Sequence, residues 1–193
     1  NYSHAEGYFT DAIGNYSHAE GYYTLASGGC GSHAEGYKAV ASGAASHAEG
    51  GSVDESGVYT SDTRTIGDIT ITGTTAQGHV SHAEGYFTFA QGYSSHAEGI
   101  ATTASGDASH AEGSGTTASG YISHAEGSVT TASGDYSHAE GWLTIASGIQ
   151  GSHAEGYNTT ASGQSSHAEG DGTTAIGQLS HAEGNKAKSS GQA

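Results

Sequence analysis

The 193-residue chain contains no proline, a single cysteine (Cys30) and only four basic residues, Lys38, Arg64, Lys186 and Lys188. A collagen triple helix needs proline together with glycine at every third position, so the missing proline excludes it. One cysteine can form neither a disulfide framework nor a thiolate metal cluster. No apolar run approaches the length of a membrane-spanning helix.

The few basic residues face 20 acidic ones, which gives a formal net charge of −16. A surface this acidic repels phosphate backbones, so nucleic acid is excluded as a partner, and direct contact with an anionic membrane is disfavoured. Twelve of the acidic residues are the Glu of a recurring Ser-His-Ala-Glu-Gly unit. The acidity is therefore a property of the repeat.

Leu, Ile, Val and Phe are scarce, whereas Gly occurs 33 times. In a non-repetitive chain this composition would indicate disorder, because too little apolar surface can be buried. A stacked repeat needs only small side chains that fit the same slot in every coil. The composition is thus compatible with an ordered repeat protein. Asn1 falls within a repeat, so we expect a piece of a longer chain.

The Ser-His-Ala-Glu-Gly unit recurs at a period of 14 residues, with two spacings of 15 and one of 35. The longer spacings lie in connectors, at residues 29–31 and 149–151, and the longest contains a 21-residue insertion. Insertions confined to connectors predict strands that keep their register and turns that vary in length. We predict one repeat domain over residues 1–193, interrupted by an insertion at residues 51–73.

Each period has two halves, Ser-His-Ala-Glu-Gly plus two residues and Thr-x-Ala-x-Gly plus two, as in residues 116–120. Small residues at the first and third positions show the alternation of a strand, and Gly supplies the positive φ of a sharp corner. In a helix, each Gly would cost about 1 kcal/mol relative to Ala. We therefore predict an all-β parallel solenoid with two short strands per coil. Its interior would hold Ser3 and Ala5 opposite Thr10 and Ala12.

Stacked at about 4.8 Å, the coils would form a rod on the order of 60 Å long. Its Ala, Ser and Thr interior gains little from burial, since each buried CH₂ contributes roughly 0.8 kcal/mol. A single roll would be weakly stabilised, so we expect it to oligomerise.

The string Ala-Ser-Gly-x-x-Ser-His-Ala-Glu-Gly, for example residues 104–113, resembles the head repeats of trimeric autotransporter adhesins (YadA-like, Hep/Hag). Their pattern is Ala-x-Gly-x-x-Ser-x-Ala-x-Gly at the same period. The resemblance covers nearly the whole chain except the insertion, and it implies a left-handed β-roll assembled as a homotrimer. The unit is also similar to repeats in surface and phage tail or neck-appendage proteins of Gram-positive systems. The adhesin heads often carry Val and Ile where this chain has His and Glu.

His and Glu lie two residues apart on one strand, so both point outward on the same face. Stacking would line them up in ladders, where hydrogen bonds from His offset the repulsion between Glu carboxylates. The corresponding positions of the second half vary, as at Asp11, Leu25 and Phe89. Uniformity indicates a shared environment, which a subunit interface provides. The predicted interface ladder consists of His4, Glu6, His18, Glu20, His33, Glu35, His47, Glu49, His82, Glu84, His96, Glu98, His110, Glu112, His124, Glu126, His138, Glu140, His153, Glu155, His167, Glu169, His181 and Glu183.

Two other interpretations of the ladder are a solvent-exposed face and a metal site, because His beside Glu is a legitimate ligand set. Twelve identical units favour architecture, so we predict no metal, cofactor or catalytic residues and no enzymatic activity. Ser3, His4 and Glu6 do not form a triad, since neighbours on a strand point to opposite faces. Full protonation of the 13 His would change the charge from −16 to −3. Assembly could therefore respond to pH near 6.5, the usual His pKa.

The connectors and the insertion carry the candidate ligand contacts. Aromatic residues often follow the Glu-Gly pair, and they either pack on neighbouring coils or contact a ligand. Within the insertion, residues 58–60 and 68–72 are predicted strands and residues 61–67 their connection, which gives a hairpin serving as decoration or recognition element. The candidate contacts are Tyr22, Tyr23, Arg64, Tyr86, Phe87, Trp142 and Tyr157.

The pattern favours a structural and adhesive segment of an extracellular trimeric fibre, either a surface adhesin head or a phage-type tail fibre. Its partners would be copies of itself and a host glycan or surface protein. The alternative is an ice-binding solenoid, since Thr103, Thr117 and Thr131 form an outward run. That run is broken by Phe89 and Ile145.

Overall fold

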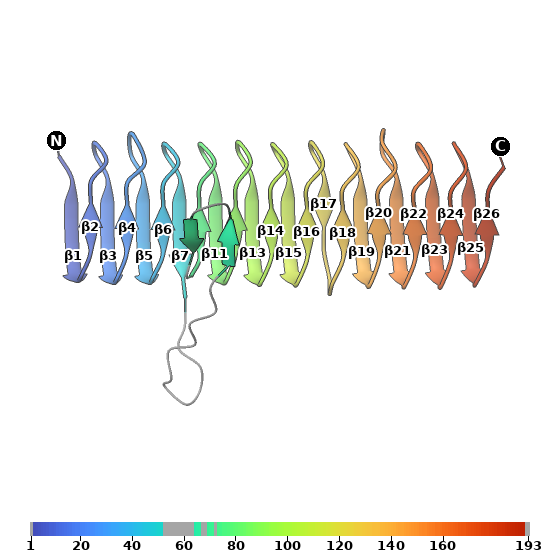
Figure 1. The fold of residues 1–193 in the computed structure, drawn as a ribbon, viewed down its shortest axis with the longest axis horizontal. Coiled ribbons are helices and arrows are strands. Elements are labelled where there is room, and N and C mark those ends of the chain that lie inside the picture. The colour runs from blue at the N-terminus through green and yellow to red at the C-terminus, as the bar shows by residue number, and fades with distance from the viewer. Residues whose placement is uncertain (1, 52–63, 67–68, 72, 192–193) are drawn as a thin grey trace, which may run out of the picture.

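The computed structural model describes residues 2–51, 64–66, 69–71 and 73–191. Over these residues the chain forms a straight rod of stacked coils with its two ends at opposite tips (Figure 1). All assigned elements are strands, and within this part of the chain no helix is long and apolar enough to cross a membrane. The predicted parallel β-solenoid with two short strands per coil is confirmed.

Two 12-stranded sheets run the length of the rod. The sheet built from the Ser-His-Ala-Glu-Gly units, here called the long-strand sheet, contains β1 (His4–Tyr8), β3 (His18–Tyr22), β5 (His33–Tyr37), β7 (His47–Gly50), β11 (His82–Tyr86), β13 (His96–Ile100), β15 (His110–Ser114), β17 (His124–Ala125), β19 (His138–Trp142), β21 (His153–Tyr157), β23 (His167–Asp171) and β25 (His181–Asn185). The short-strand sheet contains β2 (Asp11–Ala12), β4 (Leu25–Ala26), β6 (Val40–Ala41), β10 (Thr75–Ala76), β12 (Phe89–Ala90), β14 (Thr103–Ala104), β16 (Thr117–Ala118), β18 (Thr131–Ala132), β20 (Ile145–Ala146), β22 (Thr160–Ala161), β24 (Thr174–Ala175) and β26 (Lys188–Ser189).

Within both 12-stranded sheets, every strand pairs in parallel with the equivalent strand of the next coil, so equivalent positions of the repeat lie side by side. His4 lies beside His18 and Glu6 beside Glu20, and the same register continues along the rod. Strand β7 pairs directly with β11, which sets His47 beside His82. The register of the coils therefore continues across the insertion.

The interior is the predicted column of small side chains. From β3 to β25 the Ala residues of both sheets are buried, as are the small residues that directly precede each strand of these sheets. The prediction fails in the first coil, where Ser3 and Ala5 are exposed and Thr10 and Ala12 are half-buried, because a coil stacks on them from one side only.

Most of the Ser hydroxyls close the corners, because they donate a hydrogen bond to the carbonyl of a Gly three residues earlier, whereas those of Ser32, Ser137 and Ser180 have no partner. These donors are Ser17, Ser46, Ser81, Ser95, Ser109, Ser123 and Ser166, at 2.6–2.8 Å. The Thr positions are different: the hydroxyls of Thr24, Thr88, Thr102, Thr116, Thr130, Thr144, Thr159 and Thr173 are buried without a hydrogen-bond partner.

Each coil needs its two Gly residues for different reasons. Gly113 has a φ of 102°, and a Cβ there would also overlap the carbonyl oxygen of Gly127 in the next coil. Gly120, which ends the Thr-x-Ala-x-Gly half, has no positive φ, so the prediction of positive φ at both Gly positions is wrong for this half. It is required because a Cβ would overlap the carbonyl oxygen of Gly134. The left-handed turn that follows falls on the second connector residue, as at Ile122 with a φ of 51°.

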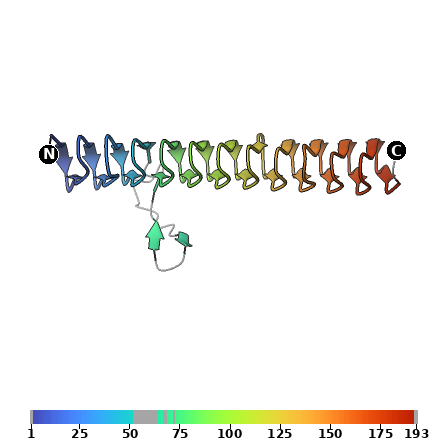
Figure 2. The same ribbon diagram turned by 90° about the horizontal axis from the view of Figure 1, so that it is seen from above.

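The insertion contains a pair of antiparallel strands, β8 (Arg64–Ile66) and β9 (Ile69–Ile71), with Thr65 opposite Thr70. They lie to one side of the stacked coils (Figure 2). The prediction that residues 61–67 form only a connection is wrong for Arg64–Ile66, whose β-branched Thr and Ile favour a strand. Residues 58–60, the other predicted strand, lie outside the described residues.

Candidate functional site: the His–Glu ladder

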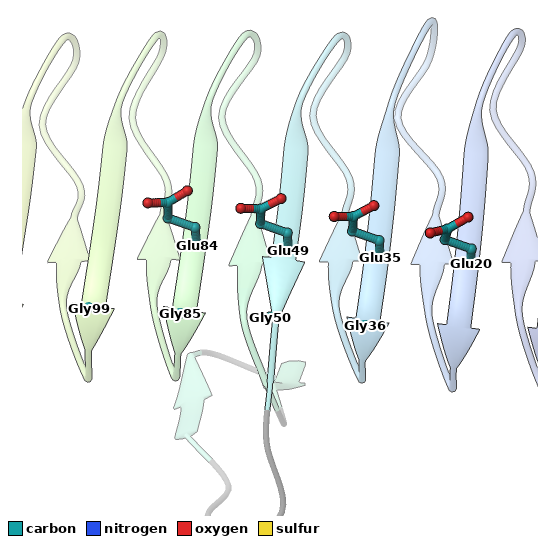
Figure 3. A pocket seen from close by; sticks show the side chains of 8 residues that line it. All are labelled: Glu20, Glu35, Gly36, Glu49, Gly50, Glu84, Gly85 and Gly99. Carbon is teal, nitrogen blue, oxygen red and sulfur yellow. The ribbon is translucent and has the colours of Figure 1, made fainter.

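The outer face of the long-strand sheet carries the His–Glu ladder, defined as the His and Glu of all twelve Ser-His-Ala-Glu-Gly units. The intervening Ala points into the core, so His and Glu are forced onto the same outer face. Figure 3 shows Glu20, Glu35, Glu49 and Glu84 standing in a row on this face. The structure therefore places the predicted ladder residues on one face of the rod.

The imidazole rings form a continuous stack. From His18 to His181, neighbouring ring centroids lie 4.7–4.8 Å apart, and most neighbouring planes are within 12° of parallel. The stack loosens at the first coil, where the rings of His4 and His18 meet edge to face at 69°. The strand spacing thus dictates ring stacking wherever a coil has neighbours on both sides.

The pairing of His with Glu changes along the rod. In the first coils each His lies near the Glu of its own strand, and the distance from Nε2 to the carboxylate is 3.4 Å in His33–Glu35 and 3.8 Å in His96–Glu98. In later coils the closest carboxylate belongs to the preceding coil, as in His124–Glu112 at 3.2 Å. Near the end His167 lies within 3.8 Å of Glu carboxylates in both coils. Glu98 and Glu169 each have the imidazoles of two neighbouring coils within 4.0 Å.

The ladder is half-buried, and burial shifts the pKa of several of its groups. Burial, reinforced by the neighbouring His on each side, lowers the pKa of His33, His110 and His153 despite the nearby carboxylates. For Glu126 burial acts to raise the pKa, but the hydrogen bond from His138 and other neighbours hold it below the usual value. At neutral pH these three imidazoles are consequently neutral and the carboxylate of Glu126 is ionised.

Many ladder nitrogens have no hydrogen-bond partner. The Nε2 atoms of these imidazoles are shielded from solvent, and the nearby carboxylates lie outside hydrogen-bonding geometry. A buried polar atom left without a partner costs free energy, so this face is incompletely satisfied in a single chain. The His residues concerned are His18, His33, His47, His82, His96, His110, His153 and His167.

A shallow groove of about 580 Å³ runs beside the Glu row, and the Gly residues that follow the Glu in each strand form its floor. Gly36, Gly50, Gly85 and Gly99 lack side chains there, so the backbone is open to the surface (Figure 3). A second groove of the same kind lies beside Glu155, Glu169 and Glu183. The ladder is thus bordered by bare backbone onto which another surface can fit closely.

The predicted aromatic contacts gather in separate groups. Tyr22 stacks between Tyr8 and Tyr37, with ring centroids 5.1 and 5.5 Å apart, and Tyr23 stacks on Phe9 at 5.0 Å. Further along, Tyr86 meets Phe87 edge to face at 4.5 Å.

A third group follows near the far end, where Trp142 and Tyr157 lie 4.9 Å apart and are 54% and 43% exposed. The backbone of Arg64 is in β8, but its side chain lies outside the description. The candidates therefore form distinct patches along the rod, and their role as ligand contacts stays a prediction.

Sequence reasoning missed contacts at the opposite connectors. The carboxylate of Asp107 accepts a hydrogen bond from the backbone N–H of Tyr93 at 2.9 Å, and Asp135 does the same for Tyr121 at 3.0 Å. Both Asp residues directly follow a core Gly, at Gly106 and Gly134, and that shared position is the signal that could have identified them. These contacts tie neighbouring coils together at their edge.

The short-strand sheet offers no comparable ladder. Thr75 and Phe89, predicted to face outward, are only 1% exposed, whereas Ile145 at the equivalent position is 42% exposed. All three share one register position of the sheet, so their burial does not contradict the outward assignment. A continuous flat Thr face, which ice binding would require, is absent from the described part of this sheet.

Comparison with known families adds one finding. A family model described as the YadA head domain repeat matches residues 154–180 in two copies. No curated protein matches the chain. The matched segment begins in β21, and the parallel register carries the same coil from β1 to β26. Residues 154–180 are therefore similar to the YadA head repeat, in agreement with the resemblance seen in the sequence, and the remaining coils share their strand register.

Proposed function

We propose that this chain, a solenoid of YadA-like head repeats, is a structural and adhesive segment of an extracellular trimeric fibre whose three copies meet along the His–Glu ladder. The observation that carries the proposal is the ladder itself. It is uniform across all twelve units, while the outward positions of the other sheet vary. The family supports an adhesive surface fibre and self-association as a trimer. It gives no support to a virion appendage.

The interior alone is a weak source of stability. Among the described residues its largest buried side chains are Thr, apart from Phe89. Such a thin column gains little hydrophobic free energy per coil. Association along one sheet supplies additional burial at every coil, which suits a fibre that must stay rigid.

The His–Glu ladder has the exposure and the hydrogen-bonding groups that a subunit interface needs. Its side chains are already about one-third exposed, as at Glu112 and His124, with side-chain exposures of 33% and 35%. Covering them would desolvate the carboxylates unless each gains a donor, and the His of a neighbouring chain is the donor present in equal number. The repeat would then match at every coil, because all three copies share one period.

The adhesive role belongs to the connectors in this proposal. The aromatic patches are suited to a host glycan or surface protein. Their rings are exposed at Tyr23, Trp142 and Tyr157 and half-buried at Tyr22, Tyr86 and Phe87. Arg64 in the insertion is a further candidate contact. The ice-binding alternative gains no support, because the outward run of Thr is interrupted at buried Phe89 and at Ile145.

A pair of charge variants tests the interface. Glu112→Lys with Glu126→Lys places two cations on the ladder, whereas Thr117→Lys with Thr131→Lys places two in the same region on the short-strand sheet. We expect the ladder variant to dissociate into single chains and the control to keep the mass of the parent assembly. Light scattering after gel filtration measures both. Equal masses for the two variants would contradict the ladder as the contact surface.

A further inference from the structure

Within the His–Glu ladder, nitrogen and oxygen ligand atoms of a single chain gather in clusters. In His110–Glu112–His124, one ligand atom from each residue lies within 4.8 Å of the others. The next cluster, His124–Glu126–His138, shares His124 with the first. Similar groups occur in other coils, including Glu35–His47–Glu49. The clusters thus repeat with the coil.

The separations match the edge lengths of a metal coordination shell. Two ligand atoms each about 2.1 Å from a tetrahedral ion lie about 3.4 Å apart. The Nε2-to-Oε1 distance is 3.2 Å between His124 and Glu112 and 3.1 Å between His138 and Glu126. It is 3.4 Å between His153 and Glu140. One carboxylate oxygen and one imidazole nitrogen are therefore already spaced to share an ion, and a nitrogen of the second imidazole lies within 4.8 Å of both.

The ligand atoms are also in a suitable chemical state. The Nε2 of His110 is shielded from solvent and lacks a hydrogen-bond partner. Burial favours neutral imidazole, which is the form that binds metals, and each Glu adds one negative charge. Imidazole with carboxylate suits zinc and its first-row neighbours, whereas magnesium prefers an all-oxygen shell.

We propose that the His–Glu ladder binds divalent transition-metal ions, zinc foremost, with each ion held by a Glu carboxylate and by the imidazoles of its own and the next coil. One divalent ion neutralises two carboxylates, so the twelve ladder Glu match about six ions per chain. Water completes each shell. Because all the protein ligands come from one chain, binding does not rest on the proposed trimer.

Equilibrium dialysis of the untagged chain against Zn²⁺ or Mg²⁺, followed by elemental analysis, tests the inference. We expect bound zinc to saturate near six ions per chain and magnesium to show no saturable binding. The triple variant His110→Gln, His124→Gln and His138→Gln removes three of the twelve ladder His. It should lower bound zinc by about a third, since the remaining neighbouring His pairs can hold about four ions. The matched control is His79→Ala, since His79 is exposed in a connector outside the ladder.

Several results would overturn the inference. The first is that the chain binds zinc no better than magnesium. The second is that the triple variant and the His79 control lose the same amount of bound zinc. Circular dichroism checks that each variant keeps its strands, and Glu112→Gln with Glu126→Gln replaces the triple variant if it unfolds. The mass of the assembly, measured on the same samples, separates the two proposals. A monomer that binds zinc contradicts only the trimer, and a trimer that binds none contradicts only the metal site.

Discussion

The imidazole of His124 lies parallel to that of His110, with ring centroids 4.8 Å apart and planes 3° from each other. That separation is the spacing of neighbouring strands, so the backbone of the solenoid dictates the stacking of the rings. The same spacing places the Nε2 of His124 3.2 Å from the carboxylate of Glu112 in the preceding coil. The chemistry of the ladder is therefore a consequence of the coil period.

Acid should destabilise the metal-free fold. The pKa values of His33, His110 and His153 are lowered in the folded chain, so the unfolded chain binds protons more readily near pH 6.5. Their contribution to stability is fully present above the ordinary His pKa and is lost as pH falls below it. We expect the midpoint of thermal unfolding, followed by circular dichroism in EDTA, to fall by several degrees between pH 7.5 and pH 5.

The opposite result has a clear meaning. Protonation also relieves the net charge of −16, which acts to stabilise the folded state. A melting midpoint that rises on acidification would show that relief of general repulsion outweighs the cost of charging the buried imidazoles. Measurements in high salt, which screens exposed charges, separate these effects.

Two buried hydroxyls in the same region should respond oppositely to removal. Thr116 is fully buried and its hydroxyl has no hydrogen-bond partner, so Thr116→Val should raise the free energy of unfolding by about 1 kcal/mol. Ser123 donates to the carbonyl of Gly120 at 2.8 Å, so Ser123→Ala should lower it by about 1 kcal/mol. Denaturant titration of both variants measures the difference. The reverse order of stability would contradict this account of the interior.

Gly113 and Gly29 form a second matched pair. Gly113→Ala forces a side chain into a backbone with a φ of 102° and against the carbonyl oxygen of Gly127. We expect a loss of about 3 kcal/mol or more in unfolding free energy. A Cβ on Gly29 meets nothing within 4 Å, so Gly29→Ala should change it by less than about 0.5 kcal/mol. Similar melting midpoints for the two variants would show that the coils can shift apart to accept a side chain.

The sequence predicts the architecture well because a strict period leaves few alternatives. Ala19 and Ser17 lie in the core as the alternation requires, and His18 and Glu20 share the outer face. What the sequence could not predict depends on distances between coils. The Ser-His-Ala-Glu-Gly unit is identical in every coil, so the sequence does not indicate whether a Glu pairs with the His of its own coil or with that of the next coil. In the structure this pairing changes along the rod.

Three further features were also beyond the sequence. Gly120 is required by the close approach of Gly134, a contact between residues 14 positions apart that local turn rules do not describe. Phe89 and Thr75 keep the alternation of their sheet but are buried, whereas Ile145 at the equivalent position is exposed. Arg64–Ile66 is a strand because it pairs with Ile69–Ile71, and without a repeat nothing in the insertion indicated that register.

The central claim is that three chains associate along the ladder, and the mass of the native assembly tests it most directly. Light scattering at neutral pH should give three times the chain mass of 19.2 kDa. A mass equal to one chain, with the strands intact by circular dichroism, would contradict the trimer and the ladder as its contact surface.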